Sequence, residues 1–420
     1  MKTIHKSTKL ANVLYDVRGP IVDAARQMED EGQKIIKLNI GNLAPFGFEP
    51  PEEIVQDMIR NLPDSAGYSD SKGIFSARKA VMHYTQEQGI EGVTIDDIYL
   101  GNGASDLIGM ATNALLSEGD EMLVPAPDYP LWTAVASLSG GKPVHYLCDE
   151  DNGWMPRLED IRAKITPRTK AIIPVHAFGQ PADMDPILEI AARYNLAVIE
   201  DACEAIGAEY KGRQAGTLGE AAIFAFYPNK QMTTGEGGMI ITDNEDWANL
   251  FRSLRNQGRD VFDAWLNHTR LGYNYRMDEL SAALGLAQIG RIEELLAKRE
   301  QVATWYNERI DKIPGIQKPF ISDTTTRMSW FVYVIRCEDD VSRNRLMKYL
   351  EQEGVPSRPY FTPIHLQPFY QREFGWKRGD LPNTEKAGDN FLALPFSGVM
   401  TEEQVDYVAH KLREGIEAAQ

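Results

Sequence analysis

The sequence predicts an α/β fold, with a mostly parallel central sheet in a large domain and a smaller α+β domain toward the C-terminus. From about residue 50, helix-like and strand-like runs alternate, which is typical of a parallel sheet covered on both faces. Some apolar strand-like runs end in an acid or a glycine, at the strand ends where such sheets bind ligands. The chain of 420 residues is long enough for two or three domains.

The elements follow from hydrophobic spacing, with apolar residues three and four apart predicting helices and short apolar runs predicting strands. In the first part we expect helices at 52–61, 74–88, 104–116, 131–138 and 187–194, and strands at 97–100, 121–125, 171–175, 197–201 and 221–226. After Met277 the pattern changes to long helices at 279–289 and 292–313, then a strand at 329–336 and helices at 342–353 and 402–419. We therefore expect a crossing segment at 1–50, a large domain at 51–300 and a small domain at 301–420.

Composition narrows the class of protein. A hydrophobic content of 43% and a charged content of 25% are ordinary for a soluble globular protein. The net charge of −17 argues against nucleic-acid or anionic-membrane partners, and no apolar run reaches membrane-spanning length. The first residues lack the apolar stretch of a signal peptide. Three cysteines without CxxC spacing indicate reduced thiols in a cytoplasmic protein. The histidines show no metal-ligand spacing, so no metal site is expected.

Two residues carry the strongest chemical signal. Lys230 follows the apolar run 221–226 and precedes a glycine-rich stretch, while Asp201 ends the apolar run 197–201. An enzyme that uses pyridoxal 5′-phosphate (PLP) needs both residue types, because a lysine holds the cofactor as a Schiff base and an aspartate pairs with its pyridinium nitrogen. The alternatives are an exposed loop lysine at 230 and a helix-capping aspartate at 201.

Other candidates lie near predicted strand ends. Ala104 and Ser105 begin a predicted helix, whose N-terminal amides suit a phosphate, although a plain N-cap fits the same pattern. Tyr129 is suited to stacking on a cofactor ring or to closing a turn. Glu204 lies three residues after Asp201, where it would reach the cofactor's phenolic oxygen or act as a first-turn helix acid.

Two further positions are open between site and structure. Asn274 lies in a polar-aromatic stretch, 272–276, where it would contact a phosphate or a substrate, or cap the next helix. His365 would line a pocket or be a satisfied structural histidine, and the structural interpretation is favoured. The same holds for His176.

The motifs resemble fold-type I PLP enzymes, in two branches. Residues 1 to about 170 resemble the class I alanine aminotransferases, and residues from about 165 to 420 resemble the DegT/StrS-type sugar aminotransferases. The first resemblance rests on segments 14–20, 38–42, 67–73, 101–105 and 124–132, and the second on 174–181, 200–207, 224–238, 271–276, 355–360 and 364–369. Segment 164–172 reads naturally in either branch. We hypothesise that the chain is a recombinant chimera joined there.

The resemblance implies roles for individual residues. Lys230 takes the Schiff-base role, Asp201 the pyridinium role, and Glu204 the place beside the phenolic oxygen. Ala104 and Ser105 match the class I phosphate turn, and Tyr129 matches its ring-stacking aromatic.

Two matched residues imply shared active sites. Tyr68 matches the class I tyrosine that reaches a neighbouring subunit's phosphate, and Asn274 matches the sugar-family asparagine with a similar task. The resemblance therefore implies at least a homodimer.

Departures from both patterns leave the substrate open. The class I loop rich in Asn and Pro is replaced by segment 175–180, and the class I carboxylate-binding arginine near the C-terminus is absent. Ala225 replaces a serine common in the sugar family, and Leu43 replaces a usual proline. We expect ping-pong transamination from an amino acid such as glutamate to a keto-sugar nucleotide, or to a 2-oxo acid held by Tyr15 and Arg18. Arg18 would equally suit a surface ion pair. The alternative is an engineered PLP-binding chimera with little or no turnover.

Overall fold

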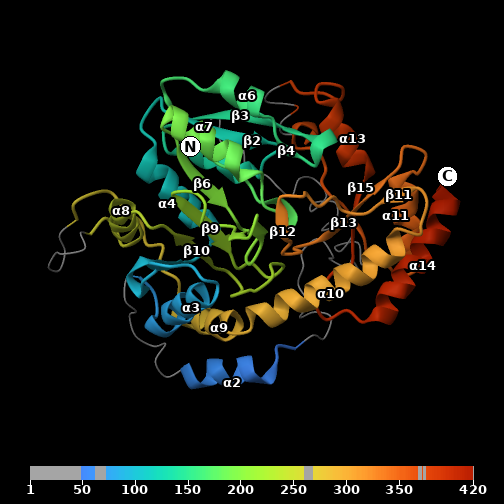
Figure 1. Ribbon diagram of the computed structural model, residues 1–420, viewed down its shortest axis with the longest axis horizontal. Helices are drawn as coiled ribbons and strands as arrows, with labels where there is room; N and C mark the ends of the chain where they lie inside the picture. Colours follow the sequence, from blue (N-terminus) through green and yellow to red (C-terminus); the bar gives the residue numbers. More distant parts are fainter. Residues whose placement is uncertain (1–48, 62–71, 260–267, 368–370, 372–374, 420) are drawn as a thin grey trace, which may run out of the picture. The chain divides into compact units, whose positions relative to one another are not determined.

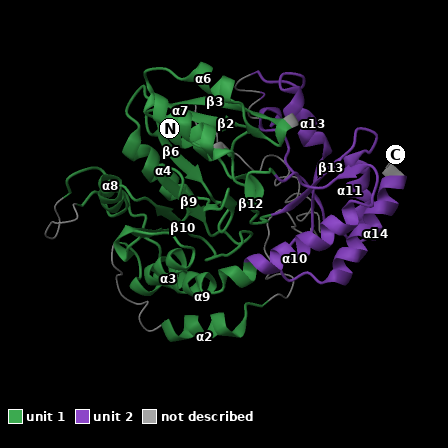
Figure 2. Ribbon diagram, in the orientation of Figure 1, with its two compact units in different colours: residues 1–13, 42–295, 322–331 green, residues 14–41, 296–321, 332–420 purple. Residues whose placement is uncertain are grey.

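The structure, a computed structural model, describes residues 49–61, 72–259, 268–367, 371 and 375–419. It divides into two compact units (Figure 2). The described part of the first unit runs to Leu295 and includes Ser322–Phe331, and the second unit holds Leu296–Ile321 and the chain from Val332 onward. Each unit is described by itself below.

The first unit is built on an eight-stranded sheet in the order β1-β10-β9-β6-β5-β2-β3-β4 (Figure 1). The strands are β1 (Ile98–Gly101), β2 (Glu121–Ala126), β3 (Lys142–Asp149), β4 (Met155–Pro156), β5 (Thr169–Ile172), β6 (Ala197–Asp201), β9 (Ala221–Ala225) and β10 (Gly238–Ile241). The pairs from β3 through β2, β5 and β6 to β9 are parallel, whereas β10 is antiparallel to both β9 and β1. The predicted α/β fold with a mostly parallel sheet is confirmed.

Helices surround this sheet in the first unit. They are α2 (Glu52–Asn61), α3 (Phe75–Glu87), α4 (Ala104–Leu115), α5 (Pro130–Leu138), α6 (Leu158–Lys164), α7 (Met184–Tyr194), α8 (Glu245–Arg255) and α9 (Glu279–Ile289). Both α2 and α3 pack against α9, and α4 packs against α5 and α8. None of the helices in the described ranges is long and apolar enough to cross a membrane.

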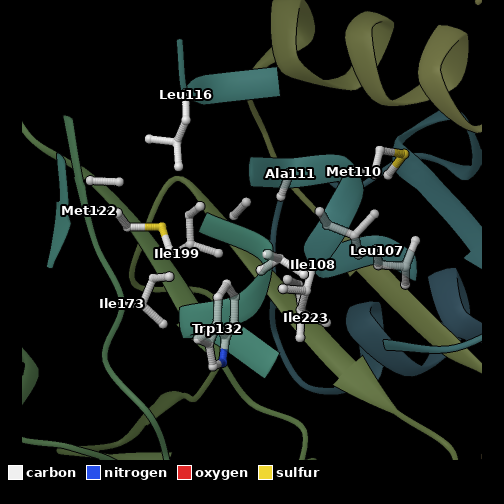
Figure 3. Packing of buried hydrophobic residues seen from close by; sticks show 14 of the residues in the cluster. Leu107, Ile108, Met110, Ala111, Leu116, Met122, Trp132, Ile173, Ile199 and Ile223 are labelled. Atoms are coloured by element: carbon white, nitrogen blue, oxygen red, sulfur yellow. The ribbon is translucent and has the colours of Figure 1, made fainter. Parts of the chain in front are cut away.

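Two hydrophobic clusters show how the period-two pattern of strands covers the two faces of the sheet. Met122 and Val124 of β2 join a cluster with residues of α4, α5 and α8 (Figure 3). The alternate residue Leu123 joins a second cluster with residues of α6 and α7. Because successive strand side chains point to opposite faces, this division places helices on both faces.

The remaining elements form smaller sheets. In the first unit, β7 (Glu209–Tyr210) pairs with β8 (Arg213–Gln214) and with β12 (Thr325–Arg327). The second unit has a four-stranded antiparallel sheet of β11 (Ile316–Gln317), β13 (Tyr333–Cys337), β15 (Phe391–Leu394) and β14 (Arg358–Pro359). Its helices are α11 (Arg343–Gln352), α13 (Pro382–Asn390), α14 (Glu402–Ala419) and most of α10 (Ile292–Ile310).

Two predicted strands were misplaced. The run predicted as 171–175 forms β5 at Thr169–Ile172, because the ladder with β2 begins at the register pair Glu121–Thr169 and ends at Leu123–Ile172. The run predicted as 329–336 forms a strand only from Tyr333, because Ser329 and Phe331 instead bond to the backbone of Gly179 and Phe178.

Candidate active site

Four of the predicted site residues, Lys230, Asp201, Ala104 and Ser105, lie at or just beyond the ends of the neighbouring strands β1, β10, β9 and β6. Gly101, at the end of β1, pairs with Gly238, at the start of β10, and Gly238 pairs with Ala225, at the end of β9. Asp201 ends β6 and pairs with Ile223 of β9. The end of β6 with Asp201, the end of β9 before the Lys230 loop, and the end of β1 before helix α4 therefore lie at the same edge of the sheet.

Asp201 is fixed by the polypeptide around it. It is 6% exposed, and its backbone amide donates to the Pro174 carbonyl at 2.9 Å. Its Oδ2 accepts a hydrogen bond from Trp132 Nε1 at 2.6 Å, and its Oδ1 accepts one from the Cys203 amide at 3.1 Å. A carboxylate has further lone pairs to accept another donor, so both contacts leave capacity for a ligand.

Lys230 stands on a tight turn between β9 and β10. The turn is closed by hydrogen bonds from the Lys230 amide to the Tyr227 carbonyl and from the Thr234 amide to the Phe226 carbonyl, at 3.0 and 2.9 Å. The side chain is only 14% exposed. Its Nζ lies 3.3 Å from Glu204 Oε1 and 4.2 Å from the centroid of the Phe331 ring. The interpretation of Lys230 as an exposed loop lysine is therefore wrong.

Glu204 links this lysine to the neighbouring loop. Its Oε2 accepts a hydrogen bond from the Phe178 amide at 2.9 Å. Its carbonyl accepts one from Gln231 Nε2 at 2.5 Å, and the same amide group donates to Ser329 Oγ at 2.7 Å. Glu204 thus lies beside the lysine amine, on the side of the site formed by the loop after β5.

The predicted phosphate turn is pressed against β10. A Cβ on Gly238 would lie 2.5 Å from the Ala104 amide nitrogen, closer than real Cβ contacts. Gly103, the residue before α4, provides no side-chain cap to the first amides of the helix, and Ser105 is exposed. Ser105 therefore lies on the exposed side of the first turn of α4. The absence of a side chain at Gly238 allows β10 to approach this turn closely.

Two predicted residues present exposed side chains. Tyr129 directly precedes α5 and is 47% exposed. Asn274 is also exposed, and a β-bridge to Asn256 holds its backbone, with Tyr273 and Tyr275 stacked at 4.9 Å on either side of it in the sequence.

The remaining predicted residues lie outside the described ranges or in the second unit. Tyr15, Arg18 and Tyr68 lie outside the described residues. His365 belongs to the second unit, where its Nε2 lies 3.0 Å from Glu385 Oε1 and both side chains are 6% exposed. The bond from His365 lowers the pKa of Glu385. His365 is therefore engaged in a buried contact with Glu385.

His176 is a structural histidine, as favoured from the sequence. Its Nε2 lies 2.8 Å from Glu200 Oε2, both side chains are fully buried, and its Nδ1 accepts from the Ala182 amide. Glu200 also accepts backbone amides of Gly216, Leu218 and Gly219. Burial alone would raise the pKa of Glu200, but these hydrogen bonds outweigh burial and hold its pKa below the ordinary 4.5.

Sequence reasoning missed two side chains of the site, Trp132 and Phe331. Both are large buried aromatics, a residue type that is also typical of an ordinary hydrophobic core. Their contacts with Asp201 and Lys230 join positions 69 and 101 residues apart, as the numbering shows. Within the described ranges, no cluster of three or more His, Cys, Asp or Glu residues is suited to hold a metal ion.

A lysine on a turn, a strand-end aspartate and a helix N-terminus at the same sheet edge are the groups that a PLP-dependent enzyme needs. The chain belongs to the DegT/DnrJ/EryC1/StrS aminotransferase family, whose model matches residues 98–413. This match starts well before residue 165, where the motifs suggested that the sugar-aminotransferase resemblance begins. The predicted enzyme class and the predicted cofactor, PLP, are confirmed at the level of the family.

Relatives come from both predicted branches. The chain is 40% identical over 316 residues to the GDP-perosamine synthase of Caulobacter vibrioides, covering 73% of this chain and 82% of that protein. It is 57% identical over 207 residues to the glutamate-pyruvate aminotransferase AlaA of Escherichia coli, covering 48% of this chain. The match spans about half of AlaA, 51% of its length. The solved structure of DesV from S. venezuelae with a ketimine intermediate is 29% identical, with a TM-score of 0.76 over 87% of this chain and 94% of that one.

The residues present fit PLP. The cofactor has a carbonyl that reacts with an amine, a ring nitrogen that prefers an acid, and a phosphate that prefers backbone amides. Lys230 would meet the carbonyl, Asp201 the ring nitrogen, and the first turn of α4 the phosphate. All three start from neighbouring strand ends of one sheet. The close packing of Gly238 on Ala104 keeps that turn next to the lysine-bearing loop.

Proposed function

We propose that this chain is an active PLP-dependent aminotransferase, which takes an amino group from an amino acid such as glutamate and passes it to a keto acceptor in a ping-pong reaction. The single observation that carries the proposal is the convergence of Lys230, Asp201 and the α4 N-terminus at one sheet edge. When bound, PLP supplies an electron sink for the bond-breaking step.

In this proposal, the residues around the lysine amine have distinct tasks. Lys230 binds the cofactor through its amine and, once displaced by the amino donor, moves a proton between the substrate Cα and the cofactor C4′. Glu204 and Phe331 bracket the displaced amine, since Nζ lies 3.3 Å from Glu204 Oε1 and over the Phe331 ring.

The cofactor is held at its two ends by other groups. Asp201 meets the ring nitrogen, while Ala104 and Ser105 bind the phosphate through the helix N-terminus. Tyr129 lies against the ring. Asn274 and Tyr68 reach the phosphate of a partner subunit, so the active assembly is a homodimer.

For the acceptor we favour a keto-sugar nucleotide. Support comes from the GDP-perosamine synthase relative, which is 82% covered, whereas AlaA is covered over about half of its length. The rival is pyruvate or another 2-oxo acid, gripped by Tyr15 and Arg18. The two acceptor classes are separated by offering each to the protein after an amino donor has charged the cofactor.

The second candidate is a PLP-binding protein with little or no turnover, formed by recombination within segment 164–172. The observation that favours it is the partial reach of the AlaA match beside the longer match to GDP-perosamine synthase. These two shares of the chain together exceed its length, so the two matches overlap.

The test is the visible absorbance of the purified protein with PLP, before and after L-glutamate or L-alanine. An active enzyme shows a band of lysine-bound PLP that collapses to the amine form with a donor. A stable band that ignores both donors supports the inactive chimera. Absence of any band overturns the PLP proposal. Lys230→Ala is the control, and if it kept the band, Lys230 would not be the cofactor lysine.

A further inference from the structure

The indole of Trp132 is hydrogen-bonded to the predicted pyridinium partner. Its Nε1 donates to Asp201 Oδ2 at 2.6 Å, within hydrogen-bond range and at its short end. Trp132 is fully buried and Asp201 is 6% exposed, so water does not compete for this contact. Figure 3 shows the Trp132 ring in the core cluster with its nitrogen directed away from Leu116.

Packing gives the indole one orientation. Trp132 lies in α5 and belongs to the cluster that also contains Ile173, Ile199 and Ile223, three residues of the sheet or its immediate extension. A ring clamped in a close-packed core stays in one rotamer. Its N–H is a donor without acceptor capacity, so Asp201 satisfies a group whose burial would otherwise be costly.

Asp201 depends on this contact in turn. Its other oxygen accepts a hydrogen bond from the Cys203 amide at 3.1 Å, and this donor comes from the turn that directly follows Asp201. A second donor at Oδ2, from a different element, fixes the carboxylate plane. Charge-assisted hydrogen bonds of this kind are the stronger ones in proteins.

We propose that Trp132 is a positioning residue, which orients Asp201 so that the carboxylate meets the ring nitrogen of PLP. The inference rests on the proposed function, since it presumes that Asp201 faces the cofactor. Trp132 acts through Asp201 and touches neither substrate nor reacting atoms.

The test compares three variants for PLP affinity and for the pH profile of the bound cofactor's visible absorbance. Trp132→Phe keeps an aromatic ring and removes the donor. Trp132→His restores a ring N–H. Trp247→Phe is the matched control, because it removes an indole packed against the same cluster without a contact to Asp201. All three are checked for cooperative melting.

We expect Trp132→Phe to shift the pH profile, to weaken PLP binding and to lower kcat on the order of 10- to 100-fold with KM little changed, because a misplaced group costs rate steeply. Trp132→His should recover part of the wild-type profile, and Trp247→Phe should match wild type. A Trp132→Phe protein with wild-type affinity and pH profile overturns the proposal.

The outcomes separate this inference from the proposed function. If the wild-type protein binds PLP but does not react with amino donors, the enzymatic proposal is overturned. The pH profiles of the bound cofactor in wild type and in the Trp132 variants still test the role of Trp132. A wild-type protein without a PLP band overturns both. If Trp132→Phe does not melt cooperatively, the test rests on Trp132→His. A folded His variant that recovers no part of the wild-type pH profile speaks against a role of Trp132 through its N–H donor.

Discussion

Gly238 and Ala104 are packed so closely that a Cβ on Gly238 would lie 2.5 Å from the Ala104 amide nitrogen and 2.7 Å from the Gly103 carbonyl carbon. Both contacts are with backbone, which has no side-chain rotamer by which to yield. Gly238 starts β10 and Ala104 starts α4, so this contact fixes the proposed phosphate turn against the strand that follows the lysine loop. The glycine is therefore required by a close approach of two backbones.

We predict that Gly238→Ala weakens PLP binding by at least about tenfold, or about 1.4 kcal/mol, because the added methyl pushes the first turn of α4 away. Overpacking should also lower stability by about 1–3 kcal/mol. Equilibrium dialysis with PLP and thermal melting measure the two effects. The matched control is Gly109→Ala in the same helix, where a Cβ meets nothing within 4 Å.

The control should bind PLP like wild type and melt slightly higher, since alanine is favoured over glycine within a helix by about 1 kcal/mol. Equal PLP affinity in Gly238→Ala and wild type would show that the α4 turn has no part in binding the phosphate.

The second prediction concerns the thiols, which should be inert in the folded protein. Burial raises the pKa of Cys203 well above its ordinary value, that of Cys148 to about 12 and that of Cys337 to about 11. At pH 8 the thiolate fraction of Cys337 is then roughly one in a thousand, and thiolate is the reactive form. A chromogenic disulfide reagent should react slowly with native protein and titrate three thiols after unfolding. Fast labelling of Cys203 in native protein would contradict its raised pKa.

Much of the sheet could be predicted because several of its strands are apolar runs that end at a polar residue or a glycine, which is visible in the sequence. The strand at Ala197–Asp201 has the predicted bounds, since an apolar run ends there in an acid. The helix at Glu279–Ile289 also has the predicted bounds. The antiparallel strand β10 was not predicted, because it begins at Gly238 inside a run of glycines that indicates a turn.

The site was predictable only where one residue type has a dominant chemical use. Lys230 and Asp201 could be proposed because a lysine on a tight turn and an acid at a strand end are residue types that PLP requires. Trp132 was not found, because its role depends on a partner 69 positions away and its local pattern is that of a core aromatic. The required glycine at 238 depends likewise on a backbone contact with Ala104 that sequence spacing does not reveal.

The third prediction is that the pair of His176 and Glu200 makes stability depend on pH in the acid range. The pKa of Glu200 is lower in the folded protein than its ordinary value of 4.5. The carboxylate therefore stabilises the fold fully above pH 4.5, and this contribution is lost as the pH falls through the folded pKa. Glu200→Gln should cost about 3 kcal/mol at pH 7, because it breaks a buried pair that also accepts three backbone amides.

Urea unfolding at a series of pH values checks this prediction. Wild type should lose stability more steeply than Glu200→Gln as the pH falls below 4.5. Glu91→Gln is the control, since Glu91 is exposed and should leave the wild-type curve unchanged. Parallel curves for wild type and Glu200→Gln would mean that another group governs the acid limb.

The last prediction concerns Asn274, whose exposed side chain we propose to reach the phosphate in a partner subunit. Asn274→Ala should lower PLP affinity, and Lys230→Ala should abolish the band of lysine-bound PLP. In a heterodimer of the two variants, a site that takes Lys230 from one chain and Asn274 from the other is intact. Because a two-fold dimer has two equivalent sites, each heterodimer regains one.

Co-expression with two different affinity tags isolates that heterodimer. At a PLP concentration too low to saturate Asn274→Ala, it should show about half the wild-type absorbance per dimer, more than either parent shows. The readout needs cofactor binding alone, so it holds whether or not the protein turns over. If the heterodimer binds no more PLP than the Asn274→Ala parent at that concentration, Asn274 acts within its own subunit or has no part in the site, because only a contribution across the interface can restore a site from two defective chains.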